Sequence, residues 1–134
     1  MVGDLFHSEI NKELELFKRW RTNFPQLKMQ LIKGNHDILN NSWYQDAEIE
    51  IYDPHLTIIN FTFIHDIEDS LPGTGNYFFS GHIHPGISIR GGGKQALHFP
   101  CFYFTENYCV MRHSAVLPER IALIHKRMKM CLPL

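Results

Sequence analysis

The sequence predicts a layered α/β sandwich, and three features of the 134-residue chain carry that prediction. A helix-like segment precedes a series of short apolar runs that are separated by loops. Hairpin signals dominate the second half of the chain. Polar motifs flanked by glycine follow several of the apolar runs, and ligands gather at the carboxyl ends of strands in open α/β sheets. A chain of this length forms one domain.

The first half of the chain predicts a helix followed by short strands. Apolar residues at helical spacing indicate a helix over 8–24, which Ser8 would cap and Pro25 would end. The strands that follow are expected at 27–33, 48–52 and 56–59. The last two are expected to pair as a hairpin, because Pro54 presets the backbone of the turn between them. A polar, partly helical connection is expected over 38–47.

The second half predicts mainly strands. Runs of β-branched and aromatic residues place them at 62–64, 77–80, 87–90, 97–104 and 108–111. The segment 91–94 is expected to be a hairpin turn, since it lacks the strand-loop-helix setting of a phosphate-binding loop. We expect one partial domain over 1–110 and a divergent tail over 111–134.

Charge and cysteine content bound the function. The formal net charge of −1 gives no broad electrostatic attraction for nucleic acid. No apolar run approaches the roughly 20 residues needed to cross a bilayer, and no leader peptide is apparent, so no membrane partner is expected. Three cysteines without paired spacing indicate reduced thiols and a cytoplasmic location.

Metal-type ligands follow four of the apolar runs. The motifs are Gly3-Asp4, Gly34-Asn35-His36-Asp37, His65-Asp66 and Gly81-His82-Ile83-His84. A carboxylate, an amide oxygen and several imidazoles suit Mn, Fe, Co, Ni or Zn, whereas a thiolate cluster would indicate structural zinc. Asp4 has two oxygens and could bridge two cations about 3.5–4 Å apart. Glycine beside a ligand allows the backbone to turn sharply off its strand.

In this order, the motifs resemble those of the bacterial calcineurin-like metallophosphoesterases. Gly-Asp-Leu-Phe-His-Ser at 3–8 and Pro-Cys-Phe-Tyr-Phe at 100–104 narrow the resemblance to the PdeM-type, ligase-associated DNA damage response phosphoesterases. The resemblance implies a metal-dependent hydrolase of phosphodiester bonds, with DNA or nucleotides as substrates. It also implies two divalent cations, Mn²⁺ or else Fe, Zn or Ni, and association with DNA ligase or helicase repair factors.

The resemblance assigns roles to individual residues. The metal ligands would be Asp4, Asn35, His65, His82 and His84. Asp4 would bridge the two cations, and His84 would bind the one that the other ligands do not. His36 would stabilise the phosphate or protonate the leaving group, with Asp37 orienting it, while a metal-bridging hydroxide attacks phosphorus. His7 is either a residue that orients the bridging carboxylate or an ordinary helix-start residue.

Two departures from the family pattern give an alternative. The family's first motif, Asp-x-His after a strand, does not precede Gly3, so the chain is expected to be N-terminally truncated, with one cation site short of ligands. After Val110 the sequence leaves the family pattern, as a shifted reading frame would produce. The alternative function is therefore a catalytically inactive remnant that binds at most one metal. A metal-stabilised binding module is a third hypothesis.

Overall fold

The structure, a computed structural model, describes residues 1–5, 12–71, 73–90, 92, 96–112, 121–122 and 130–132, the last two segments by their backbone alone. The helices are α1 (Lys12–Thr22), α2 (Asn41–Asp46) and the short 3₁₀ helix η1 (Ile67–Asp69). The strands are β1 (Met29–Ile32), β2 (Ile49–Tyr52), β3 (His55–Ile58), β4 (Phe61–Ile64), β5 (Tyr77–Ser80), β6 (Pro85–Arg90), β7 (Ala96–Pro100), β8 (Phe102–Phe104), β9 (Tyr108–Val110), β10 (Ile121–Ala122) and β11 (Met130–Leu132).

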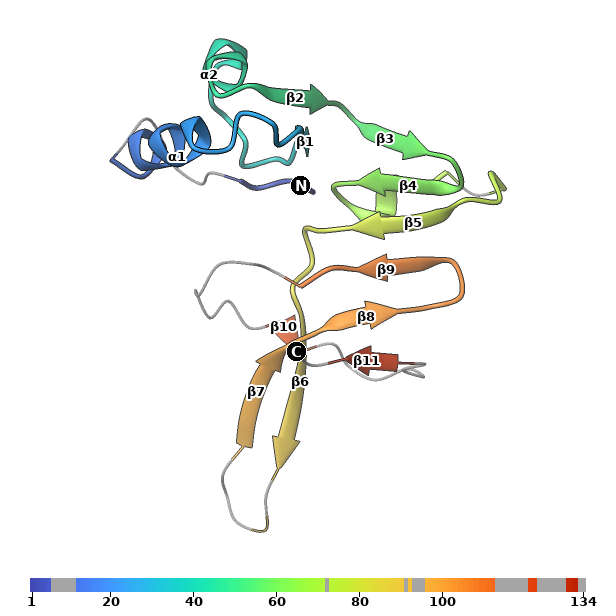
Figure 1. The fold of residues 1–134 in the computed structure, drawn as a ribbon. Helices are drawn as coiled ribbons and strands as arrows, with labels where there is room; N and C mark the ends of the chain where they lie inside the picture. Colours follow the sequence, from blue (N-terminus) through green and yellow to red (C-terminus); the bar gives the residue numbers. More distant parts are fainter. Residues whose placement is uncertain are drawn as a thin grey trace.

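The strands form three sheets (Figure 1). The largest has the order β11-β8-β9-β5-β4-β3, and β4, β5 and β9 are parallel neighbours within it. Strands β1 and β2 form a parallel pair beside the two helices, and β10, β6 and β7 form the third sheet. The predicted mixed α/β class is confirmed, while the sandwich arrangement stays a prediction.

A buried hydrophobic cluster joins helices α1 and α2 to the β1–β2 pair. Leu14 of α1, Leu31 of β1 and Ile49 of β2 pack there with Trp43 and Tyr44 of α2, and each of these side chains is buried. Residue Asn40 caps α2, since its side-chain oxygen accepts a hydrogen bond from the backbone N–H of Ser42. This cluster supports the loop that follows β1, which carries part of the predicted site.

The predicted hairpin between 48–52 and 56–59 is wrong. Strand β2 pairs in parallel with β1, and β3 pairs with β4 across the two-residue loop Ile59-Asn60. Burial explains the difference, because Ile49 of β2 belongs to the helical cluster, whereas β3 is an edge strand of the largest sheet. The turn that Pro54 presets therefore joins two sheets.

Three further expectations need correction. The helix begins at Lys12 among the described residues and ends at Thr22, before the predicted limit; its expected cap lies outside those residues. The single strand expected over 97–104 is two strands in different sheets, separated by buried Cys101. That cysteine is disulfide-bonded, so the prediction of reduced thiols fails for it, while Cys109 is free and buried.

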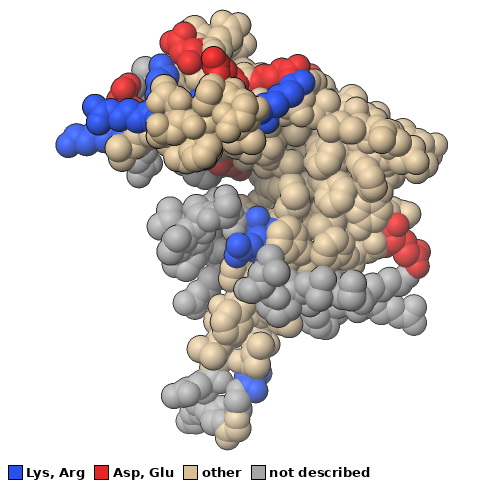
Figure 2. Space-filling model, in the orientation of Figure 1, with Lys and Arg blue, Asp and Glu red and all other residues tan. Residues whose placement is uncertain are grey.

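Charged side chains alternate in sign over the helical end of the molecule. Figure 2 shows Lys and Arg beside Asp and Glu there, and a mainly uncharged surface over the rest of this face. Three ion pairs lie in this part of the chain, Lys18–Asp46 at 3.5 Å, Arg21–Glu48 at 2.8 Å and Lys28–Glu50 at 3.2 Å. Among the described residues, this face therefore shows no continuous basic patch of the kind that binds nucleic acid broadly.

Candidate metal centre

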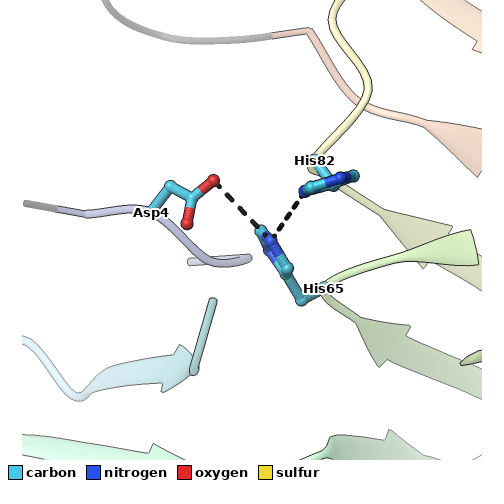
Figure 3. Close-up of side chains that lie close together, drawn as sticks. All are labelled: Asp4, His65 and His82. Atoms are coloured by element: carbon cyan, nitrogen blue, oxygen red, sulfur yellow. Dashed lines mark hydrogen bonds and ion pairs between the residues drawn. The ribbon is translucent and has the colours of Figure 1, made fainter. Parts of the chain in front are cut away.

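The loops that carry Asp4, Asn35, His65 and His82 lie close together, and three of them follow the carboxyl ends of β1, β4 and β5. An isolated parallel bridge joins Val2 to Ile32 of β1, and this bridge brings Asp4 beside the loop that follows β1. Strands β4 and β5 are parallel neighbours, so His65 and His82 leave the sheet at the same edge. Figure 3 shows the three side chains pointing toward one another.

Three polar atoms surround Nε2 of His65. Asn35 Oδ1 lies 2.9 Å away, His82 Nδ1 3.1 Å and Asp4 Oδ2 3.6 Å. The two imidazole rings meet edge to face, with centroids 4.9 Å apart. The side chains of Asp4 and His65 are only 10% and 11% exposed, whereas that of His82 is 40% exposed. One nitrogen thus faces a carboxylate, an amide oxygen and a second imidazole.

Two glycines allow the loops to approach this closely. A Cβ atom on Gly34 would lie 2.6 Å from the backbone nitrogen of Asp4, well inside van der Waals contact. At Gly3 a Cβ atom would lie 1.8 Å from Nδ1 of His65. Any side chain at either position would displace a predicted ligand.

Two of the predicted ligands have left-handed backbone conformations. The φ angle is 51° at Asp4 and 56° at His82. This region costs an L-residue with a side chain roughly 1–2 kcal/mol. Both conformations turn the chain directly after a glycine, so the fold accepts backbone strain where it places these two side chains.

Asp37 joins two of the loops. Its carboxylate is buried and accepts backbone hydrogen bonds from Leu5 and Gly34, both at 2.8 Å. The Asp4 segment and the loop after β1 are therefore tied through one side chain. Burial, with the nearby charge of Asp37, raises the pKa of Tyr44 to about 12. The predicted orientation of His36 by Asp37 stays a prediction.

His36 contacts this centre through its backbone. His36 is exposed, and its backbone N–H donates to Asp4 Oδ1 at 3.1 Å. His84 is half-buried and does not belong to the group of described residues that could hold one cation, which comprises Asp4, His65 and His82. The alternatives for His7 lie outside the described residues.

Asp66 lies beside the centre as well, although the sequence assigned it no role. Its Oδ2 is 3.6 Å from Nε2 of His82, on the side of the ring opposite the nitrogen that faces His65. The only signal in the sequence is its position directly after His65. That position alone does not show which ring the carboxylate contacts.

The chain is similar to a known protein in its structure rather than in its sequence. No protein-family model matches the chain, and no curated protein sequence matches it either. The structure is similar to the crystal structure of the Pseudomonas putida nuclease MPE, with a TM-score of 0.70 and 24% sequence identity over 89% of this chain. The match covers 61% of the nuclease. At this identity the likeness establishes a shared fold.

None of the described helices is long and apolar enough to span a membrane.

Proposed function

We propose that this chain is a metal-dependent phosphoesterase that cleaves phosphodiester bonds, with DNA or nucleotides as the substrate class. One observation carries the proposal: Asp4, Asn35 and His82 each place an oxygen or nitrogen atom that can bind a metal within 3.6 Å of Nε2 of His65. These four residues come from four separate segments of the chain. The nuclease that shares the fold supports the choice of phosphodiester substrates.

The separations between these atoms fit a shared cation. Metal bonds of about 2.1 Å place neighbouring donor atoms about 3.0 Å apart in an octahedral shell and about 3.4 Å apart in a tetrahedral one. The observed separations from His65 Nε2 run from 2.9 to 3.6 Å. Hydrogen bonds alone account for the cluster poorly, because one ring nitrogen carries at most one proton and faces three potential acceptors.

The residues around the centre would divide the work of catalysis. A bound divalent cation would supply Lewis acidity, neutralising phosphate charge and activating water. Asp4 is fixed for binding by the backbone N–H of His36. The His36 ring is exposed, so a substrate phosphate could reach it, and there it would stabilise charge or protonate the leaving oxygen. Asp37 would keep the two loops in register.

The finer parts of this proposal rest on the family resemblance alone. They are Mn²⁺ as the preferred cation, a second cation bound by His84, and a role in DNA repair beside a ligase or helicase. The proposed cytoplasmic location rests instead on the cysteine content. The domain limits, 1–110 with a tail over 111–134, also rest on the family resemblance. Segments of that tail pair with the body of the protein, β10 with β6 and β11 with β8.

A second candidate is an inactive chain that binds one cation. The observation that favours it is the position of His84, outside the described group that could hold a metal. With one cation, the residues of the centre would bind phosphate but would lack the second positive charge that two-metal phosphoesterases place on the attacking and leaving oxygens. Metal stoichiometry and turnover separate the two candidates.

Mutation of His65 tests the proposal. We expect the wild-type protein to bind Mn²⁺ in equilibrium dialysis and to hydrolyse an aryl phosphodiester when Mn²⁺ is added. The variant His65→Ala should lose at least 100-fold in Mn²⁺ affinity and all turnover, because the ring contacts every other donor.

The matched control is His98→Ala. His98 is an exposed histidine of β7 whose ring bonds Ser88, and its removal should change neither measurement. Two equivalents of Mn²⁺ with turnover support the enzyme, and one equivalent without turnover supports the inactive alternative. If the wild-type protein binds no Mn²⁺, Co²⁺ or Zn²⁺, the proposal is wrong.

A further inference from the structure

We infer that Asp66 is a positioning residue for His82, and that its carboxylate presents the Nδ1 atom of that ring to the cation. The inference rests on the proposed function, because it concerns how one ligand of that centre is held. It adds a residue to which the family resemblance gives no role.

The two oxygens of Asp66 have different partners. Oδ1 accepts a hydrogen bond of 3.1 Å from the backbone N–H of Glu68, which makes Asp66 the N-cap of η1. Oδ2 lies 3.6 Å from Nε2 of His82. The helix cap therefore holds the carboxylate in place, and its second oxygen is directed at the ring.

His82 needs such a partner because few of the described residues hold its ring. Its side chain is 40% exposed, and its backbone has a left-handed φ of 56°. Nδ1 lies 3.1 Å from His65 Nε2, so the two nitrogens of the ring face different groups. When Nδ1 donates its lone pair to a cation, the ring proton is on Nε2, where it faces the carboxylate. At 3.6 Å this is an electrostatic contact rather than a hydrogen bond.

His65 is held in another way, and the contrast supports the inference. Its ring is buried, and its Nδ1 has no hydrogen-bond partner among the described residues. Close packing against Gly3 fixes that ring, since even a methyl group there would collide with it. Packing therefore fixes the orientation of the buried His65 ring, whereas the exposed His82 ring has the Asp66 carboxylate beside it.

The substitution Asp66→Asn separates positioning from helix capping. Asparagine can still cap η1 through its side-chain oxygen, but it then presents an N–H group to Nε2 of His82. We expect Mn²⁺ affinity, read from the EPR signal of free Mn²⁺, to fall about 10–100-fold. The thermal midpoint of the metal-free protein should stay within about 1 °C of wild type. Nitrogen NMR of the metal-free protein should show a smaller Nε2–H population of His82.

Two further variants complete the test. Asp69→Asn removes an exposed carboxylate of η1 and should leave Mn²⁺ affinity unchanged. Asp66→Glu keeps a carboxylate while weakening the cap, so it should bind Mn²⁺ more tightly than Asp66→Asn. If Asp66→Asn binds Mn²⁺ as wild type does, the inference is wrong and the proposed function stands. A wild-type protein without metal binding overturns both.

Discussion

Replacement of Gly3 by alanine would test how closely the backbone packs against the His65 ring. The matched control is Gly75→Ala, because the two glycines have similar left-handed φ angles, 62° and 72°. They differ in their surroundings. An added Cβ lies 1.8 Å from His65 Nδ1 at Gly3 and has no neighbour within 4 Å at Gly75.

The two substitutions differ in expected cost. Alanine in the left-handed region loses about 1–2 kcal/mol at both positions. At Gly3 the ring must also withdraw by about 1.7 Å to restore a contact of about 3.5 Å from the observed 1.8 Å. Overpacking of this kind costs about 1–3 kcal/mol. We therefore expect a loss of about 2–5 kcal/mol for Gly3→Ala and about 1–2 kcal/mol for Gly75→Ala.

The displacement should also affect metal binding. A ring that withdraws from Gly3 carries Nε2 away from its positions relative to Asn35 and Asp4. Urea unfolding would measure stability, and the EPR signal of free Mn²⁺ would measure affinity, which should fall at least 10-fold for Gly3→Ala and stay unchanged for Gly75→Ala. Equal stability losses in the two variants, or wild-type Mn²⁺ affinity in Gly3→Ala, would refute the reasoning.

Two more predictions concern the loop after β1 and the residue that packs near it. Gly34→Ala places a Cβ 2.6 Å from the backbone nitrogen of Asp4, which cannot rotate away, so urea unfolding should show a loss of about 1–3 kcal/mol. Gly92→Ala is the control, because a Cβ at that position has no atom within 4 Å, and it should leave the free energy of unfolding unchanged. Tyr44→Phe removes a buried hydroxyl without a hydrogen-bond partner among the described residues and should stabilise the protein at pH 7 by up to about 1 kcal/mol. Because the pKa of Tyr44 is raised from 10 to about 12, wild-type stability should fall as pH rises through that interval, and Tyr44→Phe should remove this part of the decline; an unchanged pH profile would contradict it.

The sequence predicted the ligand loops better than it predicted strand pairing. Strand β5 has the predicted limits, and His65 and His82 follow β4 and β5 as expected, because apolar β-branched and aromatic runs are local signals. Pairing is not local. The turn signal at Pro54 predicted that the strands on either side of it would pair. Instead, β2 pairs with β1, because this pairing buries Ile49 of β2 in the cluster beside the helices. The contact between Asp66 and His82 could not be predicted from local sequence either. It depends on the cap that Asp66 makes on η1 and on the loop that carries His82.

Metal binding and stability should be coupled in this protein, and the reason lies in the backbone. Asp4 and His82 both have left-handed conformations, at about 1–2 kcal/mol each. Figure 3 shows their side chains on either side of the His65 ring. The described contacts that oppose this strain are few: the amide of His36 and the ring of His65 on Asp4, and Asp66 and His65 on the ring of His82. A cation that both side chains bind would offset the strain directly, because it binds the folded arrangement and not the unfolded chain. The proposed cation would therefore explain why two residues with strained backbones direct a carboxylate and an imidazole at the same nitrogen, Nε2 of His65.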